Sequence, residues 1–260
     1  MLIHRQLNKS WFKDFFNNYY HSIYADFGIF SDAQNKKETS FVASILDIPK
    51  SAKILDIPCG QGRHAVLLAK QGYSLTGVDL SDTLLEAAKK LAIKEKVKIN
   101  FFKKDMRKIT FFNEFDGVIN LFSSFGYFLN DEDNLKVLKL FNISLKPKGR
   151  FILDLLNGDQ FLKQLDKLPK KIWWKAGGAY VLLEDRSEKD KKIMVNDITL
   201  ISSNKPIKRA QSLMKLYNLI EIREYLKKSG FKILKVFGDY DKTKFLDSSH
   251  RMIILSEKIK

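Results

Sequence analysis

The feature that most constrains the fold is a regular alternation of short apolar runs and amphipathic segments between residues 53 and 156. Strands are expected at 53–57, 74–79, 97–102, 115–121 and 150–156, and helices at 62–71, 81–94 and 131–144. Such alternation is typical of parallel sheets whose crossover helices cover both faces. We therefore predict an α/β fold with a doubly wound, Rossmann-like, mostly parallel sheet, in which ligands bind at the carboxyl ends of the strands.

The segments outside this alternation follow other patterns. Residues 11–30 are dense in aromatic side chains and predict one or two short helices, and residues 38–47 predict an amphipathic helix. Strand-like runs within 172–203 are joined by a polar turn and predict antiparallel pairing. A helix at 218–228 and strands at 231–237 and 251–257 are expected in the last part of the chain.

This order of elements predicts three parts. Residues 1–50 are expected to form an N-terminal helical lid, and residues 51–158 together with 216–260 the main α/β core. The segment 159–215 is expected to be an antiparallel β insert after the fifth strand, built as a platform on the substrate side.

Charge and cysteine content narrow the function classes. The 46 Lys and Arg exceed the 30 Asp and Glu and give a net charge of +16, but only eight are Arg, spread along the chain. Phosphate-binding surfaces usually carry more Arg, so the excess of Lys indicates a solvated surface. Nucleic acid stays open as a less favoured partner. A single Cys and four scattered His predict no disulfide framework and no metal site. No apolar run approaches the ~18 residues of a membrane span, so a cytoplasmic protein without a membrane partner is expected.

The most informative stretch is ILDIPCGQGRHA at residues 54–65, which runs from a strand through two glycines into a helix. Gly60 and Gly62 let the backbone approach a ligand closely and adopt positive φ. The helix N-terminus that follows offers free N–H groups and suits an anionic group. The spacing also fits the dinucleotide fingerprint, so the loop alone leaves the nucleotide class open.

Three acidic residues at strand ends sharpen this interpretation. Asp79 ends the second strand, where a carboxylate can accept both hydroxyls of a ribose, and so implies an adenosine ligand. Asp56 ends the first strand, where it would repel a pyrophosphate but help to hold a cationic amino-acid ligand. Asp105 follows the third strand and can accept a hydrogen bond from the adenine amino group, with Met106 packed on the ring.

With these residues in place, the sequence resembles the class I S-adenosylmethionine-dependent methyltransferases. The resemblance covers about residues 54–157, through the motifs LDIPCGQGRH, TGVDLS, KDMR, FDGVINLFSSFGYF and LKPKGRFILDLLN. It implies S-adenosylmethionine as cofactor and a seven-stranded sheet with a reversed last strand, which residues 231–257 can supply. Within the family, the chain looks most like bacterial and archaeal small-molecule methyltransferases with an antiparallel insert, the plan of glycine/sarcosine-type N-methyltransferases.

The resemblance also implies which residues hold the cofactor. The expected positions are Asp56, Cys59, Gly60 and Gly62 at the methionine portion, Asp79 and Leu80 at the ribose and adenine, Asp105 and Met106 at the adenine edge, and Asn120 and Leu121 under the sulfonium. Arg63 opens the first helix and is a candidate partner of the methionine carboxylate, although it could equally face solvent.

A sulfonium methyl is already a strong electrophile, so the enzyme mainly has to align the reactants and exclude water. We therefore expect a proximity-driven SN2 displacement onto an N, O or C nucleophile of a small molecule, and we assign no catalytic residue. The candidate acceptor-site residues are Tyr19 and Tyr24 in the lid, and Ser124, Tyr127 and Asn157 at strand ends.

Three other functions stay open. The first is an RNA or protein methyltransferase that uses the basic surface, which retention on heparin and methyl transfer to bulk RNA would indicate. The second is an NAD-dependent dehydrogenase, which Asp56 and the expected reversed hairpin argue against. The third is a sensor that binds the cofactor without turnover. The oligomeric state is expected to be a monomer or a homodimer.

Overall fold

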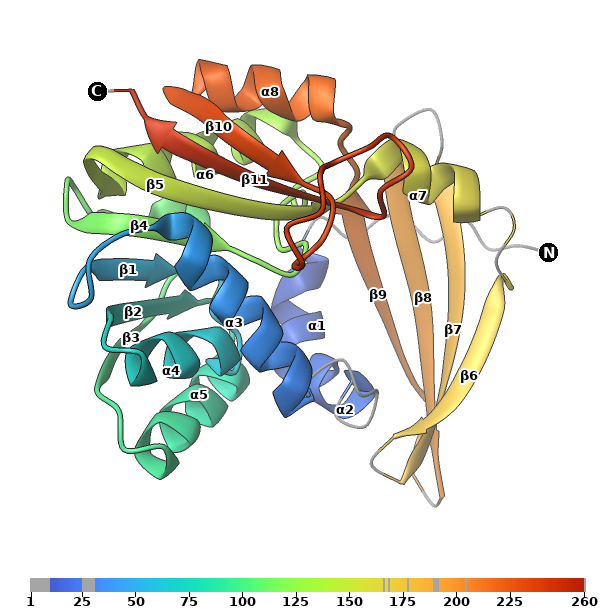
Figure 1. The fold of residues 1–260 in the computed structure, drawn as a ribbon. Coiled ribbons are helices and arrows are strands. Elements are labelled where there is room, and N and C mark those ends of the chain that lie inside the picture. The colour runs from blue at the N-terminus through green and yellow to red at the C-terminus, as the bar shows by residue number, and fades with distance from the viewer. Residues whose placement is uncertain are drawn as a thin grey trace.

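The structure, a computed structural model, describes residues 10–24, 31–165, 167, 169–176, 178–188, 192–203 and 205–259, without the side chains of residues 21 and 22. A seven-stranded sheet and a separate four-stranded sheet form its framework (Figure 1). The helices are α1 Trp11–Asn18, α2 Tyr20–Tyr24, α3 Asp32–Leu46, α4 Arg63–Lys70, α5 Asp82–Lys94, α6 Asp131–Ser144, α7 Gly158–Leu165, α8 Leu219–Lys228 and the 3₁₀ turn η1 Met106–Lys108. The strands are β1 Lys53–Asp56, β2 Ser74–Asp79, β3 Ile99–Lys103, β4 Phe115–Asn120, β5 Leu145–Leu156, β6 Lys171–Ala176, β7 Ala179–Glu188, β8 Ile193–Ser202, β9 Lys208–Lys215, β10 Phe231–Phe237 and β11 Arg251–Lys258.

The large sheet has the strand order β10-β11-β5-β4-β1-β2-β3. Strands β1 to β5 pair in parallel, whereas β11 is antiparallel to both β5 and β10. The predicted Rossmann-like sheet with a reversed last strand is therefore confirmed. The strand order reverses at the neighbours β1 and β4, so ligands are expected where the carboxyl ends of these two strands diverge.

Helices cover both faces of this sheet, and consecutive residues of a strand face opposite ways. Ile54 packs with α3 and α4, and Leu55 packs with α6 and α8 on the other face. Helix α3 begins at Asp32, six residues before the predicted start, because Ser31 caps it by accepting a hydrogen bond from the N–H of Gln34. Since Phe41, Val42, Ile45 and Leu46 of α3 are buried on the sheet, this part of the expected lid is a layer of the core.

The small sheet consists of β6 to β9 in a continuous antiparallel meander after β5, as the predicted insert requires. Strands β7 and β8 correspond to the two strand-like runs in the sequence. Strands β6 and β9, which flank them, and helix α7 were not predicted. Both strands form edges of the sheet and carry Lys and Arg, which masks the alternation of apolar residues that marks a strand. We call this four-stranded sheet the platform.

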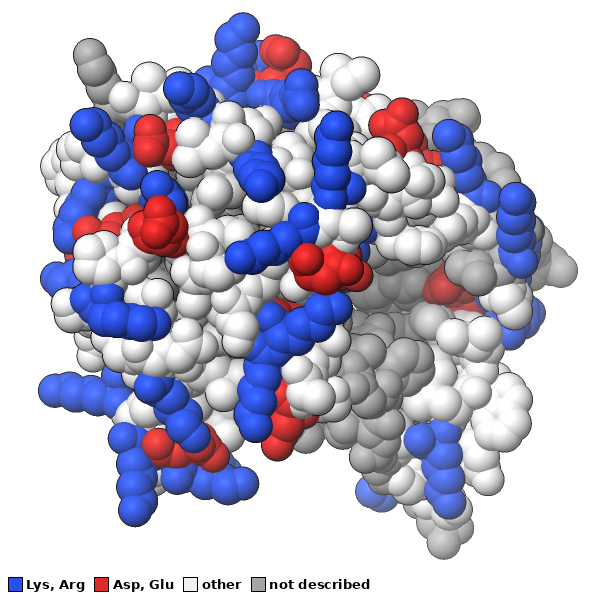
Figure 2. Space-filling view, in the orientation of Figure 1, with Lys and Arg blue, Asp and Glu red and all other residues white. Residues whose placement is uncertain are grey.

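Charged side chains are spread over the face of the molecule drawn in Figure 2. Lys and Arg are scattered there with Asp and Glu between them, and they do not gather in one basic groove. Among the described residues, no helix is both long and apolar enough to cross a membrane.

Candidate cofactor and acceptor site

A cavity of about 370 Å³ lies at the carboxyl ends of the parallel strands. Its floor, as we name it, comprises the lining residues 57–61, 63–64, 78–80, 104–106 and 121–124. Its cover comprises the lining residues of α1 and α2 and of strands β8 and β9 of the platform: Trp11, Phe12, Phe15, Phe16, Tyr20, Tyr24, Met194, Asn196, Ser212, Leu213 and Met214.

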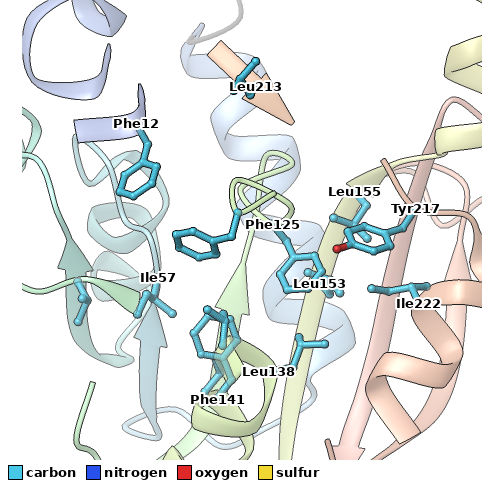
Figure 3. Packing of buried hydrophobic residues seen from close by; sticks show 14 of the residues in the cluster. Phe12, Ile57, Phe125, Leu138, Phe141, Leu153, Leu155, Leu213, Tyr217 and Ile222 are labelled. Carbon is cyan, nitrogen blue, oxygen red and sulfur yellow. The ribbon is translucent and has the colours of Figure 1, made fainter. Parts of the chain in front are cut away.

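Cover and sheet belong to one hydrophobic cluster. Phe12 of α1 and Leu213 of β9 share this cluster with Leu153 of β5, and Figure 3 shows Phe125 between them. The indole N–H of Trp174 on β6 also donates to the carbonyl of Ile23 at 3.0 Å, which ties α2 to the platform. The cover is therefore packed as part of the domain core.

The two glycines of the loop after β1 have different environments. Both have positive φ, +54° at Gly60 and +79° at Gly62. A Cβ at Gly60 would meet nothing within 4 Å, and this residue lines the cavity. A Cβ at Gly62 would lie 3.0 Å from Cβ of Ala88, so Gly62 lets α4 pack against α5. Gly62 does not line the cavity, contrary to its expected place at the methionine portion.

Asp79 joins the glycine loop to the end of β2. Its Oδ2 accepts the N–H of Gly60 at 2.8 Å, and its Oδ1 accepts the N–H of Ser81 at 2.9 Å. Ser81 is the predicted cap of α5, accepting from the N–H of Leu84. Burial raises the pKa of Asp79, and hydrogen bonds from the backbone oppose that rise. A carboxylate has about four acceptor positions, so two hydrogen bonds leave capacity for the hydroxyls of a ribose.

Asp56 and Asn120 lie beneath the floor and do not line the cavity. The Asn120 amide donates to the carbonyl of Ile57 at 2.7 Å and so joins β4 to β1. Burial raises the pKa of Asp56 to about 8, while the charge of Arg63 and an N–H of Ala65 oppose that rise. Within the described part of the chain, Oδ2 of Asp56 and Oδ1 of Asn120 have no hydrogen-bond partner. A buried carboxyl with an unsatisfied oxygen beneath an open glycine loop fits a cationic ligand such as a sulfonium amino acid, whose charge would favour the ionised form that burial disfavours.

Asp105 and Met106 line the far end of the floor, and Leu80 and Leu121 line it closer to β2 and β4. The Asp105 carboxylate is held by Arg107 at 2.6 Å. Although burial opposes ionisation, the hydrogen bonds from Arg107 lower the pKa of Asp105. The floor therefore presents an ionised acceptor at the position expected for the adenine edge.

Arg63 and His64 at the start of α4 both line the cavity and are held by Glu38 of α3. Arg63 Nη1 donates to Glu38 Oε2 at 2.5 Å, and His64 Nε2 lies 2.6 Å from the same oxygen. Burial opposes the ionisation of Glu38, but the hydrogen bond from His64 and the charge of Arg63 lower its pKa to about 2. No sequence motif marks Glu38. Its role depends on α3 lying against α4.

Cys59 also lines the floor. Its thiol is buried, and burial together with the nearby carboxylates Asp79 and Asp56 raises its pKa well above the usual value. The thiolate is the nucleophilic form of cysteine, so Cys59 is a packing residue here, without the activation that a nucleophile needs.

A strained turn follows β4. Phe122 and Ser123 both have positive φ, +60° and +55°, which costs a non-glycine residue on the order of 1 kcal/mol each. The N–H of Phe122 donates to the buried carboxylate of Asp154 at 2.7 Å. Arg251, which lines the cavity, pairs with the same carboxylate at 2.6 Å, and Tyr240 donates to it at 2.6 Å. Such strain concentrates at functional sites, and sequence alone gave no sign of this cluster.

Three of the five candidate acceptor residues, Tyr24, Ser124 and Tyr127, line the cavity. Asn157 does not, because its amide donates to the carbonyls of Asp247 and Ser249 at 3.0 Å each and anchors the loop before β11. Tyr19 does not line the cavity either, because it caps α1 at the break before α2. Tyr20 takes the expected place of Tyr19, since Tyr20 and Tyr24 are four residues apart on α2 and share one face.

No group of three or more His, Cys, Asp or Glu within the described ranges is arranged to hold a metal ion.

Comparison with known proteins agrees with this geometry. Residues 54–149 match the family described as methyltransferase domain. The putative methyltransferase YqeM of Bacillus subtilis is 26% identical over 225 residues, which cover 82% of this chain and 87% of the relative. The glycine/sarcosine N-methyltransferase of Aphanothece halophytica is 25% identical over 87% of this chain and 83% of its own length.

The fold has counterparts among solved structures. An S-adenosylmethionine-dependent methyltransferase from Clostridium acetobutylicum superposes with a TM-score of 0.75 at 21% identity, covering 87% of this chain and 92% of that chain. The matched family segment contains both the glycine loop and Asp79. Beyond this segment, the sheet continues from β5 to the antiparallel strand β11. The chain is therefore an enzyme with a methyltransferase domain, its fold is that of S-adenosylmethionine-dependent methyltransferases, and S-adenosylmethionine is its cofactor.

Proposed function

We propose that this enzyme transfers the methyl group to a small molecule that binds between the floor and the cover. The observation that carries the proposal is the cover itself, which lies over the carboxyl ends of the strands and is fixed in several places. The indole N–H of Trp11 donates to the carbonyl of Tyr127 at 3.4 Å, and the N–H of Lys215 donates to the carbonyl of Gly126 at 2.8 Å. A cavity of about 370 Å³ that is covered in this way suits a small acceptor better than a polymer.

The proposed cofactor contacts follow from the floor. Asp79 and Leu80 take the ribose and the adenine, and Asp105 and Met106 take the adenine edge. Gly60 and Cys59 lie along the methionine portion, Arg63 takes its carboxylate, and Leu121 lies near the sulfonium. Asp56, Gly62 and Asn120 support these residues from below, as their burial and contacts favour.

When bound, S-adenosylmethionine supplies a methyl group that a nucleophile can take directly from the sulfonium sulfur. The residues of the chain then have to orient the nucleophile in line with that bond and exclude water. The aromatic rings of Trp11, Phe16, Tyr20 and Tyr24 in the cover supply the apolar surface that excludes water. The in-line displacement needs no covalent intermediate with the protein, which agrees with the high pKa of the Cys59 thiol.

The names of several relatives favour nitrogen as the accepting atom. Besides the glycine/sarcosine enzymes, the matches include a dTDP-amino-sugar N,N-dimethyltransferase of Streptomyces venezuelae, 27% identical over 41% of this chain. The solved structures include a sugar N-methyltransferase from Streptoalloteichus at a TM-score of 0.69 and 15% identity. We therefore propose an amine as the first acceptor to test, with hydroxyl and carbon acceptors after it.

A panel of acceptors tests the proposal. Calorimetry should give micromolar dissociation constants for S-adenosylmethionine and S-adenosylhomocysteine, about −8 kcal/mol. Labelled methyl transfer is then measured to glycine, sarcosine, an amino-sugar nucleotide, a polyphenol and bulk RNA. Label in a small amine supports the proposal. Label in RNA alone, with retention on heparin that falls steeply with salt, would overturn it in favour of a macromolecular substrate.

A further inference from the structure

Three polar side chains form a continuous row across the platform. Asp185 on β7 lies directly opposite Asn196 on β8, and Asn196 lies directly opposite Ser212 on β9. The Asn196 amide donates to Asp185 Oδ1 at 2.5 Å, and the Ser212 hydroxyl donates to Asn196 Oδ1 at 2.9 Å. We call Asp185, Asn196 and Ser212 the polar ladder. Asn196 and Ser212 are both about 9% exposed, and both line the cavity.

The polar ladder is surrounded by apolar and aromatic residues of the cover. Met194 and Met214 are the next cross-strand pair on the same face of the platform and also line the cavity. The aromatic rings of α1 and α2 complete the cover above the floor. A polar row at an apolar wall costs desolvation energy, and that cost is recovered only if the row stays hydrogen-bonded.

The chemistry of the ladder fixes which of its groups donate and which accept. A carboxylate only accepts, so Asp185 orients the amide nitrogen of Asn196 toward itself and the amide oxygen toward Ser212. Ser212 donates its single O–H to that oxygen, so its hydroxyl oxygen can only accept a hydrogen bond from a ligand. The second amide N–H of Asn196 has no acceptor among the described residues and can only donate. Asp185 thus acts as a positioning residue.

We propose that Asn196 and Ser212 bind the methyl acceptor, and that this acceptor carries a hydrogen-bond donor next to a hydrogen-bond acceptor on a largely apolar body. A vicinal amino alcohol has this chemistry, because its amine donates to Ser212 while its hydroxyl oxygen accepts from Asn196. The inference rests on the proposed small-molecule function and narrows its substrate class.

The ladder has a matched control on the opposite face of the same strands. Asp197 and Gln211 follow Asn196 and precede Ser212, and they form a hydrogen bond of 2.7 Å with each other. Asp197 also pairs with Arg186 at 2.8 Å. Because successive side chains of a strand alternate, these residues point away from the ladder. Neither of them lines the cavity.

The test compares two probes that differ by one hydroxyl, trans-2-aminocyclohexanol and cyclohexylamine. Their affinities are measured by calorimetry or ligand-observed NMR on the full chain saturated with S-adenosylhomocysteine. The wild-type protein should bind the amino alcohol at least about fivefold more tightly, as one extra hydrogen bond predicts. This ratio should fall to about 1 in Asn196→Leu, which removes the donor to the hydroxyl. Ser212→Ala should weaken both probes about equally, because it removes the acceptor of the amine that they share, and should leave the affinity for S-adenosylhomocysteine unchanged. A general loss of structure would weaken S-adenosylhomocysteine as well.

The controls Asp197→Ala and Gln211→Ala should keep the wild-type ratio. If Asn196→Leu does not fold, the smaller substitution Asn196→Ala replaces it in the measurement of the ratio. A wild-type ratio near 1, binding of neither probe, a ratio that survives the substitution of Asn196, or unchanged affinity for both probes in Ser212→Ala overturns the inference. Binding of S-adenosylhomocysteine and methyl transfer to the acceptor panel are separate readouts, so a failed ladder is distinguishable from a failed methyltransferase assignment.

Discussion

The floor of the cavity and its cover differ in the interactions that hold them. In the floor, carboxylates bind backbone N–H groups and arginines: Asp79 binds Gly60 and Ser81, and Asp154 binds Phe122 and Arg251. The cover is held by aromatic rings in tilted and edge-to-face contact, by apolar packing and by the hydrogen bonds that Trp11 and Trp174 donate to backbone carbonyls.

This difference has a functional consequence. The contacts of Asp79 with Gly60 and Ser81 lie at the turns after β1 and β2, so this part of the floor depends on short turns and on the glycine at position 60. The cover joins α1 to β8 and β9, which are far apart in the sequence, and its side chains can change without altering the floor. We infer that the floor fixes the reaction, whereas the cover selects the acceptor.

The largest effect on stability is expected for Glu38→Gln, because Glu38 holds Arg63 and His64 of the floor. This effect should depend on pH. The folded protein holds the pKa of Glu38 near 2, below its usual value of 4.5. The stability contributed by Glu38 is therefore fully present above about pH 4.5 and is lost as the pH falls toward 2. The variant should lose about 3 kcal/mol of unfolding free energy at pH 7, and this deficit should shrink by pH 2.5.

Urea denaturation at pH 7, 4 and 2.5 measures this effect. The matched control is Glu86→Gln, because Glu86 forms only an exposed pair with Lys89 on α5. Equal deficits for Glu38→Gln at all three pH values would show that Glu38 acts through packing and not through its charge.

The next largest effect is expected for Asp79→Ala on cofactor affinity. Removing this carboxylate releases the N–H of Gly60 and takes away the proposed ribose acceptor. Calorimetry should show S-adenosylmethionine binding weakened by about 1.5–3 kcal/mol, as for lost hydrogen bonds to a charged group. Asp82→Ala, an exposed acid three residues further on, should leave the affinity unchanged. Unchanged affinity in Asp79→Ala would remove the ribose contact from the floor.

The turns of the floor could be predicted from the sequence because their signals are local. The glycine loop, the acid at the end of β2 and the Ser81 cap lie within single strand-to-helix turns, where spacing determines geometry. The same signals did not show that Asp56, Gly62 and Asn120 lie beneath the floor, and the expected cofactor roles of these three residues stay predictions. A spacing pattern places a residue at a turn, but it does not say whether the side chain points into the cavity or beneath it.

The cover could be predicted only in outline. Tyr24 was identified because it lies in an aromatic run, but Tyr19 in the same run faces away, since the helix breaks between α1 and α2. Asn196 and Ser212 gave no sequence signal, because polar residues on a strand usually face solvent. Their role depends on β8 and β9 folding back over the sheet, which is a property of tertiary packing.

A smaller effect on stability should distinguish the two glycines of the loop after β1. Gly62→Ala meets Ala88 at 3.0 Å and should lower the unfolding free energy by about 2 kcal/mol. The control is Gly178→Ala, which shares a positive φ of +80° but has nothing within 4 Å, so it should cost only about 1 kcal/mol. Gly60→Ala should resemble the control in stability but weaken cofactor binding, because its new methyl group enters the cavity. Equal stability losses for Gly62→Ala and Gly178→Ala would contradict the packing role of Gly62.

The smallest effect should separate two tyrosines of the aromatic segment and thereby test the division of roles between floor and cover. The hydroxyl of Tyr24 lies in the cover, where burial and the charge of Asp185 raise its pKa to about 12. The hydroxyl therefore stays protonated and can donate a hydrogen bond to the methyl acceptor. Tyr24→Phe should lower kcat/KM for a methylated acceptor by up to about tenfold, with unchanged affinity for S-adenosylmethionine. Tyr19→Phe should change neither quantity, because Tyr19 does not line the cavity. If Tyr24→Phe instead weakened cofactor binding and left the acceptor kinetics intact, α2 would belong functionally to the floor, and the acceptor would have to be selected by the platform alone.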